Sequence, residues 1–94
     1  MTVYLAGPIT GNTNYVEEFR SAAKELEAEG HAVLNPAMLP PKGLTHAAYL
    51  RIGLAMLAEA DMVALLPGWE KSKGASYERD HALMTGKPVR ELSK

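Results

Sequence analysis

The sequence predicts an α/β fold: a three-layer, Rossmann- or flavodoxin-like parallel sheet of about four strands with three helices. Strand and helix signals alternate along the whole chain, and the strongest strand signal is an unbroken apolar run. The length of 94 residues suits one domain, residues 1–94. The alternating order implies a parallel sheet with right-handed crossovers and helices on both faces.

The first strand and helix are predicted between residues 2 and 30. Thr2–Ala6 is a short apolar, β-prone run that stops at a Gly-Pro turn, as expected of a buried strand. Asn14–Glu29 has helical periodicity, with Asn14 as the predicted N-cap, Glu17 completing a capping-box-like pattern and Gly30 ending the helix. The residues expected on its apolar face are Val16, Phe19, Ala23 and Leu26.

The middle of the chain predicts a second strand, a loop and a second helix. His31–Asn35 reads as a short strand closed by a proline. Residues 36–44 contain three prolines and a glycine, which favour a loop. A second helix is expected to begin at Thr45 or His46, with one face formed by Leu50, Leu54 and Leu57.

The last third predicts two strands and a helix. Asp61–Leu66 lacks polar alternation, which indicates a strand covered on both faces and ended by a Pro-Gly pair. Ala75–Thr85 is predicted to be a helix closed by Gly86. A short final strand is expected at Lys87–Arg90.

Composition excludes several classes of function. Ten Lys and Arg against eleven Asp and Glu give a net charge of −1, which excludes a nucleic-acid clamp built on bulk positive charge. The absence of cysteine excludes disulfides, thiolate zinc sites and thiol nucleophiles. The three histidines are scattered without ligand spacing, so neither a metal nor a cofactor is expected.

Length and hydropathy predict a small cytoplasmic protein that forms a homodimer or larger homo-oligomer. No apolar run is long enough to cross a bilayer, and the first residues lack the features of a leader, so we expect a soluble cytoplasmic protein without membrane contact. The core of so short a chain is thin. The second helix has apolar residues on more than one side, Met56 among them, and we expect it to form a homodimer interface.

The residues that could carry chemistry follow the predicted strands. Ligands of parallel sheets bind beyond the carboxyl ends of the strands, here residues 7–14, 35–44 and 67–76. Ser72, Gly74 and Ser76 precede or open the third helix, where a backbone could approach an anion, and Glu78 is expected in its first turn or so. Each feature also has a structural explanation: Ser72 could cap the helix, and the helix dipole alone favours an early carboxylate.

Gly7 directly follows the first strand, where a glycine allows close approach of a ligand. A tight turn made from Gly7 and Pro8 is the alternative. The segment has neither the dinucleotide-binding glycine pattern nor a P-loop, so it supports neither dinucleotide nor Walker-type triphosphate binding.

Taken together, the motifs resemble the nucleoside 2-deoxyribosyltransferase superfamily, which includes the 2′-deoxynucleoside 5′-phosphate N-hydrolases. The closest resemblance is to a compact branch that is common in phages and prophages and usually has no assigned function; its Leu-Pro-Gly-Trp-Glu-x-Ser-x-Gly-Ala motif begins here at Leu66. The resemblance covers nearly the whole chain. It rests on Tyr4-Leu5-Ala6-Gly7-Pro8-Ile9, Ala60-Asp61, Ser72, Gly74, Glu78, Ala82 and Gly86-Lys87-Pro88-Val89.

The resemblance implies roles for these residues. Glu78 would be the nucleophile that attacks the anomeric carbon of a deoxyribosyl group and expels the base, with Tyr4 beside it. The sugar and its 5′ end would be held by Gly7, Ile9, Ser72 and Gly74. Trp69 could stack on a base, although a loop tryptophan is as often a packing or interface residue. The ligand would be a small nucleoside or nucleotide and not a nucleic-acid polymer.

The sequence departs from this family at the position of the general acid. The N-hydrolases have an aspartate on the second helix that helps to protonate the departing base, and the matching residue here is Gly53. Pro8 and Thr10 also stand where those enzymes have a serine and an arginine for phosphate. Three functions therefore remain open: an N-glycosidase or deoxyribosyltransferase, a catalytically silent nucleotide-binding module that senses or sequesters its ligand, and a structural or interaction protein.

Overall fold

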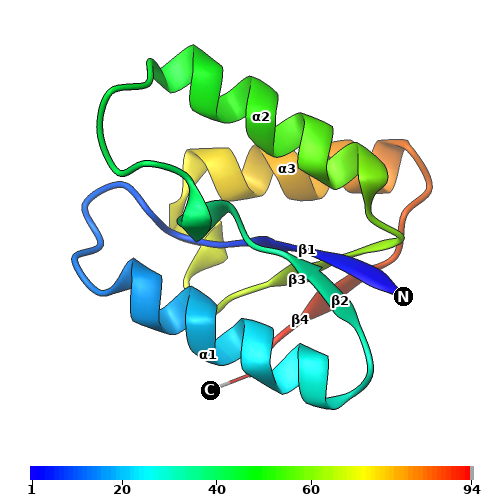
Figure 1. Ribbon diagram of the computed structural model, residues 1–94. Helices are drawn as coiled ribbons and strands as arrows, with labels where there is room; N and C mark the ends of the chain where they lie inside the picture. The colour runs from blue at the N-terminus through cyan, green and yellow to red at the C-terminus, as the bar shows by residue number, and fades with distance from the viewer. Residues whose placement is uncertain (94) are drawn as a thin grey trace.

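The computed structural model describes residues 1–93 and contains a four-stranded, all-parallel sheet (Figure 1). Its strands are β1 (Thr2–Ala6), β2 (Ala32–Leu34), β3 (Met62–Leu65) and β4 (Val89–Glu91). They lie in the order β2-β1-β3-β4, with β1 paired to both β2 and β3. This is the strand order of a flavodoxin-like sheet, whose order reverses between β1 and β3.

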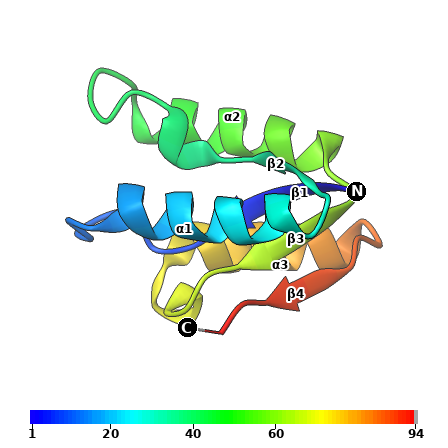
Figure 2. The ribbon, with the colours of Figure 1, turned by 60° about the horizontal axis from the view of Figure 1, so that its bottom comes forward.

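Helices cover both faces of the sheet, which gives the predicted three layers. The helix α1 (Tyr15–Ala28) lies on one face, and α2 (His46–Glu59) and α3 (Lys73–Met84) lie on the other (Figures 1 and 2). Two short 3-10 helices, η1 (Pro36–Met38) and η2 (Trp69–Lys71), follow β2 and β3. The α/β architecture predicted from the alternating pattern is confirmed.

The core has two halves, one on each side of the sheet. Alternate residues of β1 point to opposite faces: Tyr4 and Ala6 pack under α2 and α3, whereas Val3 and Leu5 pack under α1. The strand β3 has no polar alternation because both of its faces are buried. The side of the sheet that holds Tyr4 also holds the chemistry described below.

The boundaries predicted for α1 and α3 need correction. Asn14 occupies the N-cap position of α1, but its side chain makes no capping hydrogen bond, so the capping box with Glu17 does not form. Val16 is 42% exposed rather than part of the buried face, which is formed by Phe19, Ala22 and Leu26. The third helix begins at Lys73, two residues earlier than predicted, because the side chain of Ser72 caps it there.

Two polar side chains make hydrogen bonds near the starts of β1 and β3. Asp61, which is exposed, accepts a hydrogen bond from the backbone N–H of Thr2 at 2.9 Å. The ammonium group of Lys87 donates to the carbonyl of Ala60 at 2.7 Å and so anchors the carboxyl end of α2. Among the described helices, none is long and apolar enough to span a membrane.

Candidate functional site

The best-defined polar contact in the core joins β1 to α3. The phenol of Tyr4 donates a hydrogen bond of 2.6 Å to Oε2 of Glu78. Tyr4 is 1% exposed and Glu78 is 9% exposed, and Glu78 is the one buried charged residue among those described. A short O–H···O contact to a carboxyl group in a buried setting is among the stronger hydrogen bonds found in proteins.

Glu78 lies in the second turn of α3, whereas the sequence predicted the first turn or so of the helix. The positive end of a helix dipole acts within the first turn, so the dipole alone does not explain this carboxylate. Instead, the helical spacing that buries Ala75 and Ala82 against the sheet also turns Glu78 inward, toward Tyr4.

Burial dominates the ionisation of both partners. Desolvation raises the pKa of Glu78 to about 7, and the hydrogen bond from Tyr4 offsets part of this rise. Burial and the neighbouring carboxylate raise the pKa of Tyr4 well above its ordinary value, so Tyr4 remains a phenol that donates. Near neutral pH, Glu78 therefore exists as a mixture of the acid and the carboxylate, and the carboxylate is a nucleophile.

The backbone of α2 lies directly against this pair at Gly53. A Cβ atom placed on Gly53 would lie 2.7 Å from Oε2 of Glu78 and 3.0 Å from the hydroxyl of Tyr4. Both distances are too short for an undisturbed contact, so the pair occupies the space that a side chain at position 53 would need. From the sequence, Gly53 was notable only because it stands where the N-hydrolases have an aspartate. Its close packing against Tyr4 and Glu78 was not predicted.

Replacing Gly53 by alanine is expected to destabilise the fold by about 1–3 kcal/mol, because the new methyl group must displace the buried Glu78 carboxyl. Gly74→Ala is the matched control, since a Cβ there meets open space on α3 and should stabilise by up to about 1 kcal/mol. Thermal unfolding measures both. Equal stabilisation by the two substitutions would show that α2 does not pack this closely on the pair in solution.

The loop before α3, in which the sequence predicted an anion-binding element, leads directly into the amino end of the helix. The Oγ atom of Ser72 accepts a hydrogen bond of 3.1 Å from the backbone N–H of Ala75, so Ser72 caps the helix. Gly74 is exposed in the first turn, where a helix leaves backbone N–H groups without intrahelical partners. Ser72 therefore caps the helix, which is the structural explanation that the sequence offered for it. Because its side chain is engaged in the cap, the exposed backbone of Gly74 is the part of this segment that remains accessible to a ligand.

Ser72→Ala is expected to cost about 1 kcal/mol of stability, because the first turn of α3 loses its capping acceptor. Ser21→Ala, an exposed position within α1, should leave the free energy of unfolding within about 0.5 kcal/mol of the wild type. Urea denaturation of the two variants makes the comparison. An unchanged Ser72→Ala midpoint would contradict the capping role.

Trp69 is held by protein groups on two sides. Its indole N–H donates to Glu91 on β4 at 3.2 Å, and the guanidinium carbon of Arg79 lies 5.1 Å from the centre of the ring. The side chain is partly buried against the core that contains Tyr4. These contacts favour the packing interpretation of Trp69 over base stacking.

The turn after β1 packs against the hydrophobic core. A Cβ on Gly7 would lie 2.8 Å from Cβ of Leu66 and 3.3 Å from the ring of Phe19, so the close approach at Gly7 is to the protein's own core. Ile9 also packs on the α1 side of the sheet. The contacts of Gly7 and Ile9 are therefore with the α1 side of the core, whereas Gly53 lies against Tyr4 and Glu78.

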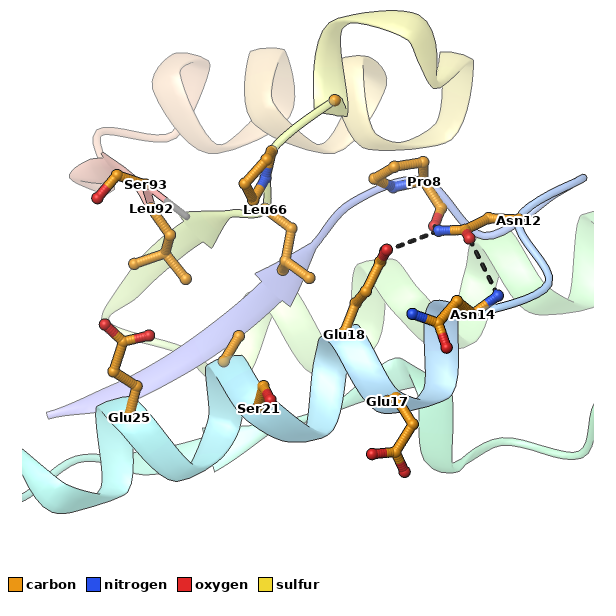
Figure 3. A pocket seen from close by; sticks show the side chains of 13 residues that line it. Pro8, Asn12, Asn14, Glu17, Glu18, Ser21, Glu25, Leu66, Leu92 and Ser93 are labelled. Atoms are coloured by element: carbon orange, nitrogen blue, oxygen red, sulfur yellow. Dashed lines mark hydrogen bonds between the residues drawn. The ribbon is translucent and has the colours of Figure 1, made fainter.

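A separate groove of about 580 Å³ lies at the carboxyl edge of the sheet, between α1 and the segments that follow β1, β3 and β4. Figure 3 shows its rim of polar side chains, where Asn12 bonds to Glu18. Neither Tyr4 nor Glu78 lines this groove. Three carboxylates along it, Glu17, Glu18 and Glu25, make it unsuited to a phosphate.

The histidines do not join the Tyr4–Glu78 pair in a site. His81 stacks against Tyr77 with ring centres 6.4 Å apart. Within residues 1–93, no three His, Asp or Glu side chains gather closely enough to hold a metal ion.

Comparison with known proteins finds a family and a relative that are similar to this chain. The model of the DUF4406 family, described as a domain of unknown function, matches residues 1–91. A protein of Thermofilum pendens named "Putative 2'-deoxynucleoside 5'-phosphate N-hydrolase 1" is 29% identical over 98 residues, which cover 99% of this chain and 68% of the relative. No solved structure matches significantly. The chain belongs to the DUF4406 family, and its predicted resemblance to the nucleoside deoxyribosyltransferase-like proteins is confirmed.

Proposed function

We propose that the protein cleaves or transfers the N-glycosidic bond of small nucleosides or nucleoside monophosphates, with Glu78 as the nucleophile. The observation that carries the proposal is the inward-facing Glu78 carboxyl, which is bonded to Tyr4 rather than to a lysine at the surface. The Thermofilum pendens relative, named for N-hydrolysis of deoxynucleoside 5′-phosphates, supports this class of chemistry.

Glu78 attacks the anomeric carbon, and a glycosyl ester forms while the bond to the base breaks. Water or a second base then attacks the same carbon and releases the carboxylate. Tyr4 holds the attacking carboxyl group in position through its 2.6 Å hydrogen bond. In this proposal the backbone around Gly74, beside the capping Ser72, receives the 5′ end of the substrate, because free N–H groups at a helix start bind anions. The roles proposed for Gly7, Ile9 and Trp69 are weaker, since all three are engaged in packing.

The second candidate function is a catalytically silent nucleotide-binding module. It is favoured by the close packing at Gly53, which leaves no acidic side chain on α2 beside the pair, and by the 9% exposure of Glu78. A binder of this kind would use the same loops and would release no base.

A base-release assay separates the two functions. The protein is incubated with deoxynucleosides and their 5′-monophosphates, free base is measured by chromatography, and the melting temperature is followed with each compound. Base release supports the enzyme. A raised melting temperature without release of base from any compound supports the silent binder. If no compound releases base and none raises the melting temperature, the sheet serves only as a scaffold.

We also propose a homodimer that uses α2. Leu50, Leu54 and Met56 remain half-buried in the single chain, and a partner would cover them. Light scattering over a range of concentrations tests this, and a constant monomer mass would refute it.

A further inference from the structure

We propose that the site formed by Tyr4, Gly53 and Glu78 takes cationic N-glycosides, whose base carries a positive charge before it departs. This inference rests on the proposed function and specifies its substrates. Pyridinium nucleotides and N-alkylated purine nucleotides are the chemical class. Three features of the site lead to it: the absence of a proton donor for the base, the absence of a positive partner for Glu78, and the packing at Gly53.

The first feature concerns the departing base. A neutral base that leaves with the bonding electrons becomes an anion, so it normally needs a proton from a general acid. Position 53 faces the pair and has no side chain, and the contacts of 2.7 and 3.0 Å leave no room for one in this arrangement. The site therefore has one carboxyl group, where retaining glycosidases have two.

Within residues 1–93, none of the groups around the pair replaces the missing acid. The proton of Tyr4 is already donated to Glu78, and the raised pKa of this phenol makes it a weak acid. On α2, Arg51 is exposed and stays protonated, and the phenol of Tyr49, one turn before Gly53, donates to the backbone carbonyl of Pro40. On α3, Asp80 is exposed and pairs with Arg79, and His81 stacks against Tyr77.

The second feature is electrostatic. Burial raises the pKa of Glu78 and the hydrogen bond from Tyr4 partly offsets this rise, while no lysine or arginine among residues 1–93 forms an ion pair with the carboxylate. A buried carboxylate without a positive partner is unfavourable. A cationic substrate supplies that partner, and by linkage its binding favours the ionised, nucleophilic form of Glu78. A neutral nucleoside does not.

With such a substrate the reaction balances without a general acid. An oxygen of Glu78 forms a bond to the anomeric carbon as the bond from that carbon to the base nitrogen breaks. The electron pair of the broken bond goes to the nitrogen and cancels its positive charge, so the base leaves neutral. Water then attacks the anomeric carbon, the ester bond to Glu78 breaks, and the proton of the water passes to solvent.

The test compares substrates that differ in charge. Guanosine 5′-phosphate and 7-methylguanosine 5′-phosphate form a matched pair, and nicotinamide mononucleotide adds a fixed positive charge; each is used as the ribose and the 2′-deoxyribose form. Free base is measured for the wild type, with Glu78→Gln as the background for spontaneous cleavage. We expect kcat/KM to be at least about 100-fold higher for the charged compounds, the low end of what a general acid contributes.

The outcomes separate this inference from the proposed function. Equal or faster cleavage of the neutral compounds overturns the inference and leaves the proposed function standing. No cleavage of either class overturns both. The pH profile with nicotinamide mononucleotide is a second readout: we expect the rate to rise with pH to a plateau as Glu78 ionises. A fall in rate between pH 7 and 9 would show that a protonated acid is required and would contradict the inference.

Discussion

Glu78→Gln is expected to lower kcat/KM for base release by at least about 1,000-fold, because glutamine keeps the size of the side chain but cannot form the glycosyl ester. The amide oxygen can still accept the hydrogen bond from Tyr4, so the fold should be preserved. Initial rates of base release by the two proteins, with the best substrate of the panel, measure the effect.

Tyr4→Phe is the control that distinguishes the nucleophile, Glu78, from the residue that donates a hydrogen bond to it. It retains the buried ring and removes the hydrogen bond that lowers the pKa of Glu78. We therefore expect activity to persist but to require a higher pH. If Glu78→Gln retained wild-type activity, Glu78 would not be the attacking group; an unchanged pH profile in Tyr4→Phe would show that the Tyr4 hydrogen bond does not set the pKa of Glu78.

The second large effect is on stability as a function of pH. The pKa of Glu78 is raised from an ordinary value of 4.5 to about 7 in the folded protein. The folded state consequently holds a proton that the unfolded state releases, and the resulting stability is fully present below about pH 4.5 and is lost as pH rises through 7. We expect wild type to lose roughly 3 kcal/mol relative to Glu78→Gln across this range.

Urea denaturation of both proteins from pH 4.5 to 8.5 measures this difference, and the comparison cancels the other titrating groups because the two chains share them. The neutral glutamine removes the cost of burying a charge, so Glu78→Gln should be the more stable protein at pH 8.5. Parallel curves for the two proteins would show that Glu78 is solvated in solution and that its carboxyl group does not lie buried against Tyr4.

Much of the fold could be predicted because the local signals agree with the tertiary structure. The apolar run of β3 becomes a strand buried on both faces, and Gly30 and Gly86 end α1 and α3 with positive φ values of 96° and 80°. The errors lie at helix starts, where capping depends on side-chain geometry. Asn14 has the right identity for a cap but makes no capping bond, whereas Ser72 does.

The candidate site could be predicted only in part. The resemblance pointed to Tyr4 and Glu78, which are 74 residues apart in sequence and meet because β1 lies beneath α3. Gly53 could not be recognised as a packing residue, because its closeness to the pair depends on how α2 sits on the sheet. The same holds for Trp69, whose partners Arg79 and Glu91 come from two other elements.

The central claim is that Glu78 becomes covalently glycosylated, and the most direct measurement is intact-protein mass spectrometry after acid quenching during turnover. With the best substrate of the panel, we predict a species heavier by one glycosyl group, with the added mass on a peptide that contains Glu78, and no such species in Glu78→Gln. Base release without any adduct on Glu78, or an adduct that persists in Glu78→Gln, would contradict the claim.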